Sequence, residues 1–200
     1  AYNTGSYQTW KDKGFDIKFR LLEERNSGLG LAIGLNDIGG TGAYSSEYLV
    51  ASKHFRNIDW SLGLGWGRLG GVDHLKNIFG WVDSDRKIRG GYTTRGGKIS
   101  LDRFFSGKNT SIFGGIEYFT PIDNLSLKLE YDTSDYSGVI GLETVFNETG
   151  DIFELDSRFN YAMNYRVNLG ERDKLDLSLG FVRGNTVYAN LSVHSNLNLF

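Results

Sequence analysis

The sequence predicts an all-β fold, an antiparallel up-and-down transmembrane β-barrel with about nine to ten strands in this chain. Three observations support this prediction. Large apolar residues alternate with small or polar ones along most of the chain, and short connections alternate with long ones. The composition combines 27 Gly, 13 Phe, 11 Tyr and 4 Trp with 1 Pro, as is typical of strand-rich proteins.

The strand signal is a period of two, because successive strand side chains point to opposite faces. Less regular strands are expected at about residues 43–55 and 110–120, residues 2–10 form a poor further candidate, and residues 72–79 predict at most a short helical turn. The regular strands have these large apolar positions, in chain order: Phe15, Ile17, Phe19 and Leu21; Leu29, Leu31, Ile33 and Leu35; Ile58, Trp60, Leu62, Leu64 and Trp66; Leu125, Leu127, Leu129 and Tyr131; Phe159, Tyr161, Met163, Tyr165 and Val167; Leu175, Leu177, Leu179 and Phe181; Val187, Ala189, Leu191, Val193, Leu197 and Leu199.

The connections between these segments differ in length. Short polar connections are expected near residues 24–28, 55–58, 121–124 and 168–174, and longer ones at 36–42, 68–109 and 133–156; the short connection at 184–185 breaks the rule. Outer-membrane barrels have short periplasmic turns and long external loops. Residues 1–200 are therefore expected to form a single outer-membrane β-barrel domain, with 68–109 as a long extracellular loop. Nine strands is an odd number for such a barrel, so either residues 2–10 add a tenth strand or the chain is a fragment of a longer barrel protein.

A soluble β-sandwich or barrel, with the apolar faces as its core, is the alternative to the membrane barrel. The polar faces of two strands are almost only Gly, Ala and Ser, which is unusual for strands that face water. The last residues, 197–200, are typical of the C-terminal strand of bacterial outer-membrane barrels. Aromatic residues on the apolar faces, several of them toward strand ends, suit the girdles of such barrels: Trp60, Trp66, Tyr131, Tyr161, Tyr165 and Phe181.

Charge and cysteine content exclude several function classes. Lys and Arg number 22 against 24 Asp and Glu, a net charge of −2 that argues against a nucleic-acid-binding protein. The absence of Cys excludes disulfide scaffolds and thiolate metal sites. Glu148, Asp151, Glu154 and Asp156 lack the spacing of a Ca²⁺-binding loop. No metal or other cofactor is expected.

Catalytic motifs are weak. The stretch 65–70 matches G-x-G-x-x-G, but it ends a strand and enters a loop, whereas a dinucleotide site needs a helix directly after the motif. His54, His74 and His194 are the histidines, and no G-x-S-x-G motif accompanies them. The chain is therefore expected not to be an enzyme.

The polar faces supply the candidate site residues. If the apolar faces meet lipid, the polar faces line a lumen whose mixed charges suit either a hydrated pathway for a polar polymer or an interior closed by ion pairs. Arg158 and Arg166 are expected to pair with Asp132 and Asp176 on neighbouring strands. In the long loop, aromatic and Arg side chains are candidates for stacking on sugar rings and pairing with acidic sugars, although a loop folded as a lid needs the same residues. The lumen candidates are Arg20, Lys128, Glu130, Asp132, Arg158, Arg166 and Asp176, and the loop candidates are Trp81, Arg89, Tyr92 and Arg95.

Eight segments carry a further signal, in chain order: residues 11–24 (KDKGFDIKFRLLEE), 37–42 (DIGGTG), 45–53 (SSEYLVASK), 62–67 (LGLGWG), 113–118 (FGGIEY), 125–132 (LSLKLEYD), 135–136 (DY) and 183–186 (RGNT). These segments resemble the YjbH/GfcD family of exopolysaccharide and capsule proteins. The resemblance implies a barrel in the bacterial outer membrane, without enzymatic activity, that serves secretion or surface assembly of exopolysaccharide or capsule. The implied partners are outer-membrane lipid, polysaccharide and other components of a secretion system, with no nucleic acid. A structural or adhesin-like barrel without transport, and an outer-membrane enzyme acting on lipid or glycan, remain alternatives.

Overall fold

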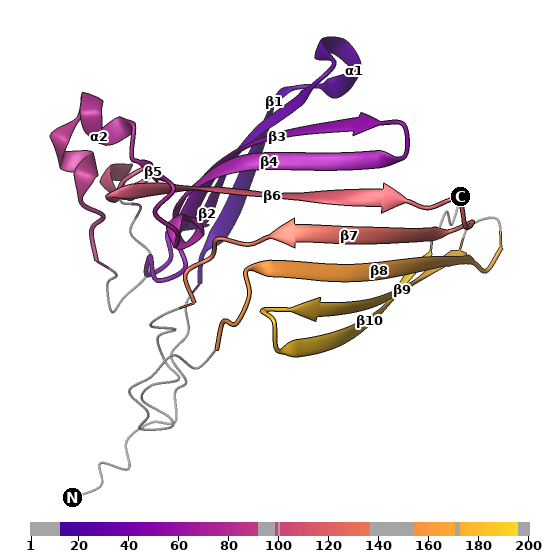
Figure 1. Ribbon diagram of the computed structural model, residues 1–200. Coiled ribbons are helices and arrows are strands. Elements are labelled where there is room, and N and C mark those ends of the chain that lie inside the picture. Colours follow the sequence, from indigo (N-terminus) through magenta and orange to yellow (C-terminus); the bar gives the residue numbers. More distant parts are fainter. Residues whose placement is uncertain (1–12, 92–98, 100, 137–153, 171–172, 196–200) are drawn as a thin grey trace, which may run out of the picture.

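The computed structural model describes residues 13–91, 99, 101–136, 154–170 and 173–195. These residues form one antiparallel sheet of 10 strands in the order β1-β2-β3-β4-β6-β7-β8-β9-β10, with β5 attached to β6 (Figure 1). The strands are β1 (Phe15–Leu22), β2 (Gly30–Ile38), β3 (Ser46–Phe55), β4 (Ile58–Gly67), β5 (Leu75–Lys76), β6 (Asn109–Phe119), β7 (Leu125–Tyr131), β8 (Phe159–Asn168), β9 (Asp173–Val182) and β10 (Thr186–Ser195).

The predicted up-and-down arrangement is confirmed, since every long strand pairs with the next long strand of the chain. The helical turn expected within residues 72–79 was placed wrongly. That segment contains β5, which pairs with β6, and the one-turn helix α2 (Phe79–Val82) follows it. A second one-turn helix, α1 (Glu24–Ser27), lies in the connection from β1 to β2. The candidate strand at 2–10 and the terminal residues 197–200 lie outside the described residues.

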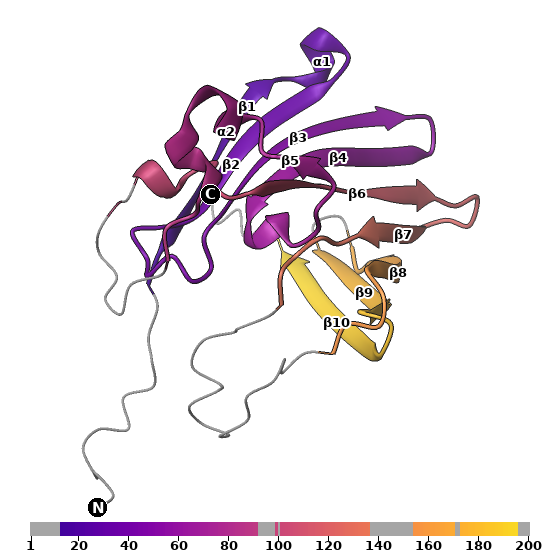
Figure 2. The same ribbon diagram turned by 60° about the vertical axis from the view of Figure 1, so that its left-hand side comes forward.

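The sheet is open in the described part of the chain. There, β1 pairs only with β2 and β10 pairs only with β9, so the two outer strands do not meet. The all-β antiparallel fold is therefore confirmed, whereas closure into a barrel stays a prediction. The sheet curves strongly, and β8, β9 and β10 turn away from the plane of β3 and β4 (Figure 2). No helix in the described ranges is long and apolar enough to cross a membrane.

The two ends of the sheet carry different connections. The longer segments 39–45, 68–108 and 132–158 join strands at one end, here called the loop end, together with the tight turn at 183–185. A tight turn is possible there because Arg183 and Gly184 adopt φ values of 59° and 78°, the two positive values that a type I′ hairpin turn requires. The segments 23–29, 56–57, 120–124 and 169–172 lie at the opposite end, here called the turn end.

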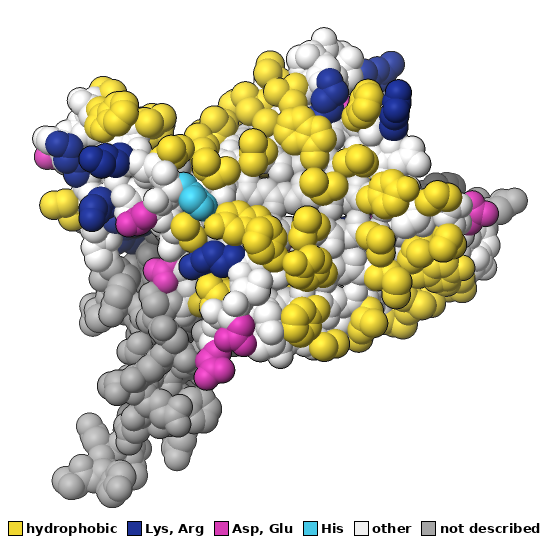
Figure 3. All heavy atoms as spheres, in the orientation of Figure 1, with side chains coloured by type: hydrophobic (Ala, Val, Ile, Leu, Met, Phe, Trp, Pro, Cys, Tyr) yellow, Lys and Arg dark blue, Asp and Glu magenta, His cyan; other side chains and the backbone are white. Residues whose placement is uncertain are grey.

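The two faces of the sheet differ in exposure and chemistry. On the apolar face, large side chains remain exposed, including Leu62 (54%) and Leu191 (64%). Figure 3 shows exposed apolar side chains spread across one side of the sheet. Among the described residues, the buried apolar side chains are few: Ala32, Ile38, Ala43 and Trp66. Residues of the segment 68–108 cover Trp66 at the loop end. Elsewhere no second layer covers the apolar face of the described strands, which is the arrangement that a lipid-facing sheet needs.

Candidate functional site

Aromatic rings lie over glycines on the polar face of the sheet. Tyr48 on β3 lies directly opposite Gly34 on β2, and Phe113 on β6 lies opposite Gly63 on β4. A Cβ atom at either glycine would overlap the ring that covers it. Tyr188 on β10 covers Gly180 on β9 in the same way. The small residues on these polar faces therefore leave room for rings from neighbouring strands.

A cavity of about 400 Å³ lies on the polar face. Phe113 of β6 and Tyr188 of β10 both line it. In a flat sheet these strands would lie roughly 19 Å apart, because strands are spaced by about 4.8 Å. Rings from both strands line one cavity because the sheet curls toward its polar face, which is therefore the concave face. We call this cavity the central trough.

The central trough has polar walls between its two rings. Its charged lining residues are Asp59, Glu117, Lys128 and Glu130, with Asn160 beside them. Lys128 Nζ lies 3.4 Å from Glu117 Oε2. Asn160 Nδ2 donates a hydrogen bond to Glu130 Oε2 at 3.1 Å, and Asn160 Oδ1 accepts one from the Arg183 backbone N–H at 2.9 Å. The structure thus brings the lumen candidates Lys128 and Glu130 into one site.

The trough continues toward the loop end. A second cavity shares Phe113, Glu130 and Asn160 with the central trough and extends to Asp132 and Tyr136. The Tyr136 hydroxyl donates a hydrogen bond to the Asp132 carboxylate. Burial and this carboxylate raise the pKa of Tyr136 to about 12, so the phenol stays protonated at neutral pH. The polar face therefore offers a connected path from the middle of the sheet to its loop end.

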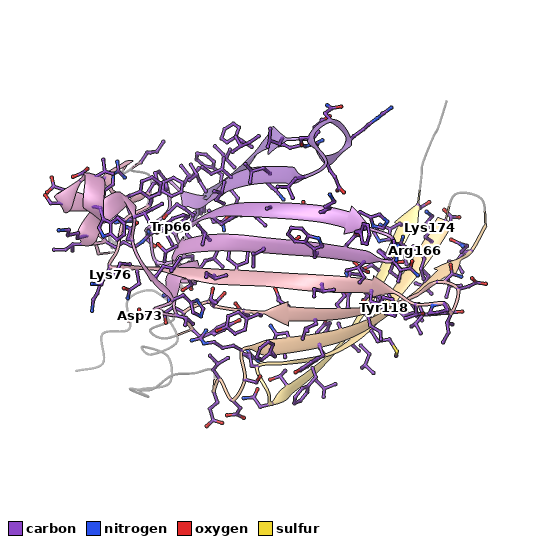
Figure 4. All side chains as sticks on the ribbon, turned by 45° about the horizontal axis from the view of Figure 1, so that its top comes forward. Trp66, Asp73, Lys76, Tyr118, Arg166 and Lys174 are labelled. Carbon is purple, nitrogen blue, oxygen red and sulfur yellow. The ribbon has the colours of Figure 1, made fainter. Side chains whose placement is uncertain are left out.

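The expected pair of Arg166 and Asp176 is confirmed near the turn end. The Arg166 guanidinium donates to both carboxylate oxygens of Asp176, at 2.6 and 2.8 Å. His194 Nε2 lies 3.3 Å from the same carboxylate. Figure 4 shows Arg166 near Lys174, at the end of the sheet opposite Trp66. This pair lies outside the lining of the central trough.

The expected ion pair of Arg158 with the Asp132 carboxylate is wrong. The Arg158 guanidinium donates instead to the backbone carbonyls of Asp132 and Ser134, at 3.3 and 3.2 Å. The Asp132 carboxylate accepts hydrogen bonds from the Ser134 N–H and from Tyr136, so it turns back onto its own loop. Arg158 also precedes β8, which begins at residue 159. Arg158 therefore fastens the loop that follows β7.

Arg20 lies apart from the trough. It is on β1, at the turn end, and its guanidinium contacts the Glu23 carboxylate at 2.9 Å with both side chains exposed. It lines a separate hollow on the polar face with Lys18. The structure therefore divides the lumen candidates among the central trough, its extension toward the loop end, the Arg166–Asp176 pair and this distant edge.

A buried ion pair holds the loop between β4 and β6. Glu47 on β3 is fully buried at 0% exposure, and both of its carboxylate oxygens accept hydrogen bonds from Arg89, at 2.7 and 2.9 Å. The Phe105 backbone N–H donates to the same carboxylate at 2.9 Å. Arg89 also donates to the backbone carbonyls of Ser45 and Arg103. The loop candidate Arg89 is thus engaged by the protein itself.

An aromatic cluster joins the same loop to the apolar face. Trp66 at the loop end of β4 is 2% exposed, and its ring centroid lies 5.7 Å from that of Phe79 and 5.2 Å from that of Phe105. Its indole N–H donates to Asn77 Oδ1 at 3.1 Å, and Asn77 Nδ2 donates to the Phe105 carbonyl at 2.9 Å. Trp66, which suited a girdle position, is instead covered by the loop.

The remaining loop candidates are Trp81, Tyr92 and Arg95. Trp81 on α2 is 75% exposed and is open to a partner. Tyr92 and Arg95 lie outside the described residues. Sequence reasoning missed Glu47 and Asn77. The sequence did contain a signal for Glu47, because this acidic residue stands where the alternation of β3 predicts an apolar one. Glu47 lies directly opposite Trp66 of β4.

Comparison with known proteins identifies the family. The family described as "Exopolysaccharide biosynthesis protein YbjH" matches residues 1–200. The "Uncharacterized lipoprotein YjbH" of Escherichia coli (strain K12) is 39% identical over 191 residues, which is 96% of this chain and 25% of that protein. The chain therefore spans a quarter of the length of this relative, and no solved structure matches it. The resemblance expected from the sequence motifs is confirmed: the chain belongs to the YjbH family of exopolysaccharide biosynthesis proteins.

Proposed function

We propose that this chain forms part of the wall of an outer-membrane β-barrel that serves exopolysaccharide secretion or surface assembly. The apolar face meets lipid and the polar concave face lines the lumen. Family membership supports the connection with exopolysaccharide. Exposed Leu62, Leu179 and Leu191 on one face, against hydrogen-bonded polar side chains on the other, support the membrane orientation.

Closure of the barrel requires strands beyond the described residues. In the described residues β1 and β10 each have one unpaired edge, and exposed edges readily pair with further strands. The E. coli relative is about four times as long as the matched region, since that region is 25% of it. A longer chain of this family has enough residues to supply the missing wall.

The trough is the observation on which the glycan role rests. Sugar rings have apolar C–H faces that stack on aromatic rings, and hydroxyls that bond to carboxylates and amides. Phe113 and Tyr188 supply the rings, and Glu130 and Asn160 supply the polar groups. We assign polysaccharide docking or passage to this surface, with no catalytic step.

The role of Tyr188 tests this function. In the full-length protein, Tyr188→Ala should lower surface polysaccharide about 2- to 10-fold, because one aromatic stacking platform contributes roughly 0.5–1.5 kcal/mol. Leu191→Ala is the matched control, since it lies on the same strand but on the apolar face. Both variants should reach the outer membrane in normal amounts. Normal polysaccharide levels with Tyr188→Ala would remove the support for the trough as the docking surface.

The histidines distinguish this function from an enzyme. His54 contacts Asp59, His194 contacts Asp176, and His74 accepts the Ile112 N–H and contacts the Tyr131 hydroxyl. In the described part of the chain, none of the three bonds to a Ser or Thr hydroxyl. Changing all three to Gln should leave surface polysaccharide near normal. A complete loss at normal protein abundance would favour the enzyme alternative.

Thiol labelling tests the orientation of the sheet. The chain contains no Cys, so a single introduced Cys reports its own position. Asp85→Cys at the loop end should react with a membrane-impermeant thiol reagent on intact cells, whereas Asp123→Cys at the turn end should react only after lysis. Both positions are exposed, and Asp123 is preferable to Asn124, which has a φ of 66°. The reverse labelling would contradict the proposed topology.

A further inference from the structure

We propose that the central trough selects uncharged glycan chains over polyanionic ones, an inference that rests on the proposed docking function. The charge of its lining is the first observation. Three carboxylates, from Asp59, Glu117 and Glu130, stand against the single ammonium group of Lys128, so the lining carries a formal charge of 1 − 3 = −2.

The one cation of the trough is already engaged. Lys128 Nζ lies 3.4 Å from Glu117 Oε2, so this ammonium group offsets a carboxylate of the lining itself. Glu117 also accepts a hydrogen bond from Ser126 Oγ at 2.7 Å, which fixes the carboxylate beside Lys128. An acidic sugar would have to compete with Glu117 for the only ammonium group in the lining.

Glu130 keeps its negative charge uncompensated. Its hydrogen-bond donor is the neutral amide of Asn160, and within the described ranges Glu130 makes no ion pair with Lys, Arg or His. Among the described residues, Asp59 has its ion-pair contact with the imidazole of His54, which balances the charge of Asp59 only when the imidazole is protonated. The low-dielectric walls of a concave site strengthen the field of such carboxylates on a ligand.

The extension toward the loop end does not reverse this balance. It adds the carboxylate of Asp132 and the guanidinium of Arg183 to the lining, so the net charge is unchanged. Arg183 Nη2 donates a hydrogen bond to Thr186 Oγ1 at 3.0 Å, so part of the Arg183 guanidinium is bonded within the turn at 183–185 and its flanking strand. Tyr136 stays a neutral phenol. The whole path therefore carries an excess of two negative charges.

The same groups suit an uncharged pyranose chain. Carboxylates accept only, and sugar hydroxyls are good donors to them in charge-assisted hydrogen bonds. Phe113 and Tyr188 offer apolar surfaces for the C–H faces of sugar rings. A glycan that carries carboxylate, phosphate or sulfate would place negative charge beside Glu130, whereas a neutral hexose places hydroxyls there.

Binding to two matched probes tests this selectivity. The full-length protein, purified in detergent, is titrated with a neutral cello-oligosaccharide and with an oligogalacturonate of equal length by calorimetry. We expect the neutral chain to bind at least about 10-fold tighter at low salt, with a smaller difference at high salt because ions screen the repulsion. Glu130→Gln, which keeps a partner for Asn160, should strengthen oligogalacturonate binding severalfold and weaken neutral binding modestly, because Gln still accepts a sugar hydroxyl but without charge assistance. Asp123→Asn removes an equal charge outside the trough and should change neither.

The outcomes separate the inference from the function on which it rests. Equal or tighter binding of oligogalacturonate by the unaltered protein would overturn the selectivity and leave glycan docking intact. No effect of Glu130→Gln on a protein that does prefer the neutral chain would overturn the assignment of selectivity to this carboxylate. If neither oligosaccharide binds, the docking function itself fails.

Discussion

Glu47→Ala should destabilise the folded protein by about 3–5 kcal/mol, because it leaves the largely buried guanidinium of Arg89 without its charged partner. The carboxylate also accepts the Phe105 backbone N–H, so this donor loses its acceptor in the same variant. The loop between β4 and β6 should then detach from Trp66. Urea unfolding in lipid vesicles measures the free energy, and limited proteolysis at the loop measures its detachment.

Another ion pair of similar length provides the control for this prediction. Arg20 and Glu23 contact each other at 2.9 Å, compared with 2.7 Å for Arg89 and Glu47, but their side chains are 69% and 53% exposed. Glu23→Ala should therefore cost less than about 1 kcal/mol. The double variant Glu47→Leu/Arg89→Met should recover much of the lost stability, because apolar replacement removes both desolvated charges together. A similar small cost for Glu47→Ala and Glu23→Ala would show that the buried pair does not anchor the loop.

Strands were predictable from the sequence because their signal is local. The alternation from Leu125 to Asp132 predicted β7 to within one residue of its observed bounds, since each residue of that strand keeps its face. The pair of Arg166 and Asp176 was predictable for a related reason, because the two residues lie directly opposite each other on adjacent strands. The similar prediction that Arg158 pairs with Asp132 was wrong, because β8 begins one residue later and Arg158 lies in the preceding loop.

The contacts of the loop between β4 and β6 were not predictable, because they join residues that are distant in the sequence. Glu47 and Arg89 are 42 positions apart, and neither alternation nor turn chemistry specifies such a contact. The rings over Gly34, Gly63 and Gly180 depend on strand register, which a single sequence leaves open. Whether the sheet closes into a barrel depends on residues beyond the described ones, and the alternation of the described strands does not determine it.

Leu129→Arg should prevent most of the protein from folding into lipid vesicles, whereas the change of the preceding residue, Lys128→Leu, should be tolerated. The two residues are neighbours at the middle of β7 but lie on opposite faces of the sheet. Leu129 is exposed on the apolar face, between Ile116 of β6 and Tyr161 of β8. An Arg on a lipid-facing strand near the bilayer midplane costs about 2–4 kcal/mol.

Lys128→Leu removes only the contact of Lys128 with Glu117, a partly exposed pair 3.4 Å apart that contributes about 1 kcal/mol or less. The fraction of each variant that folds into vesicles, and its urea midpoint there, measure the difference between the two faces. A soluble sheet would give another result, since an exposed Arg in water costs little and Leu129→Arg would then fold as well as Lys128→Leu. Equal folding yields of the two variants would therefore contradict a lipid-facing apolar surface and would indicate that a protein partner covers its exposed side chains. A loss of folding confined to Leu129→Arg would instead assign that surface to the membrane.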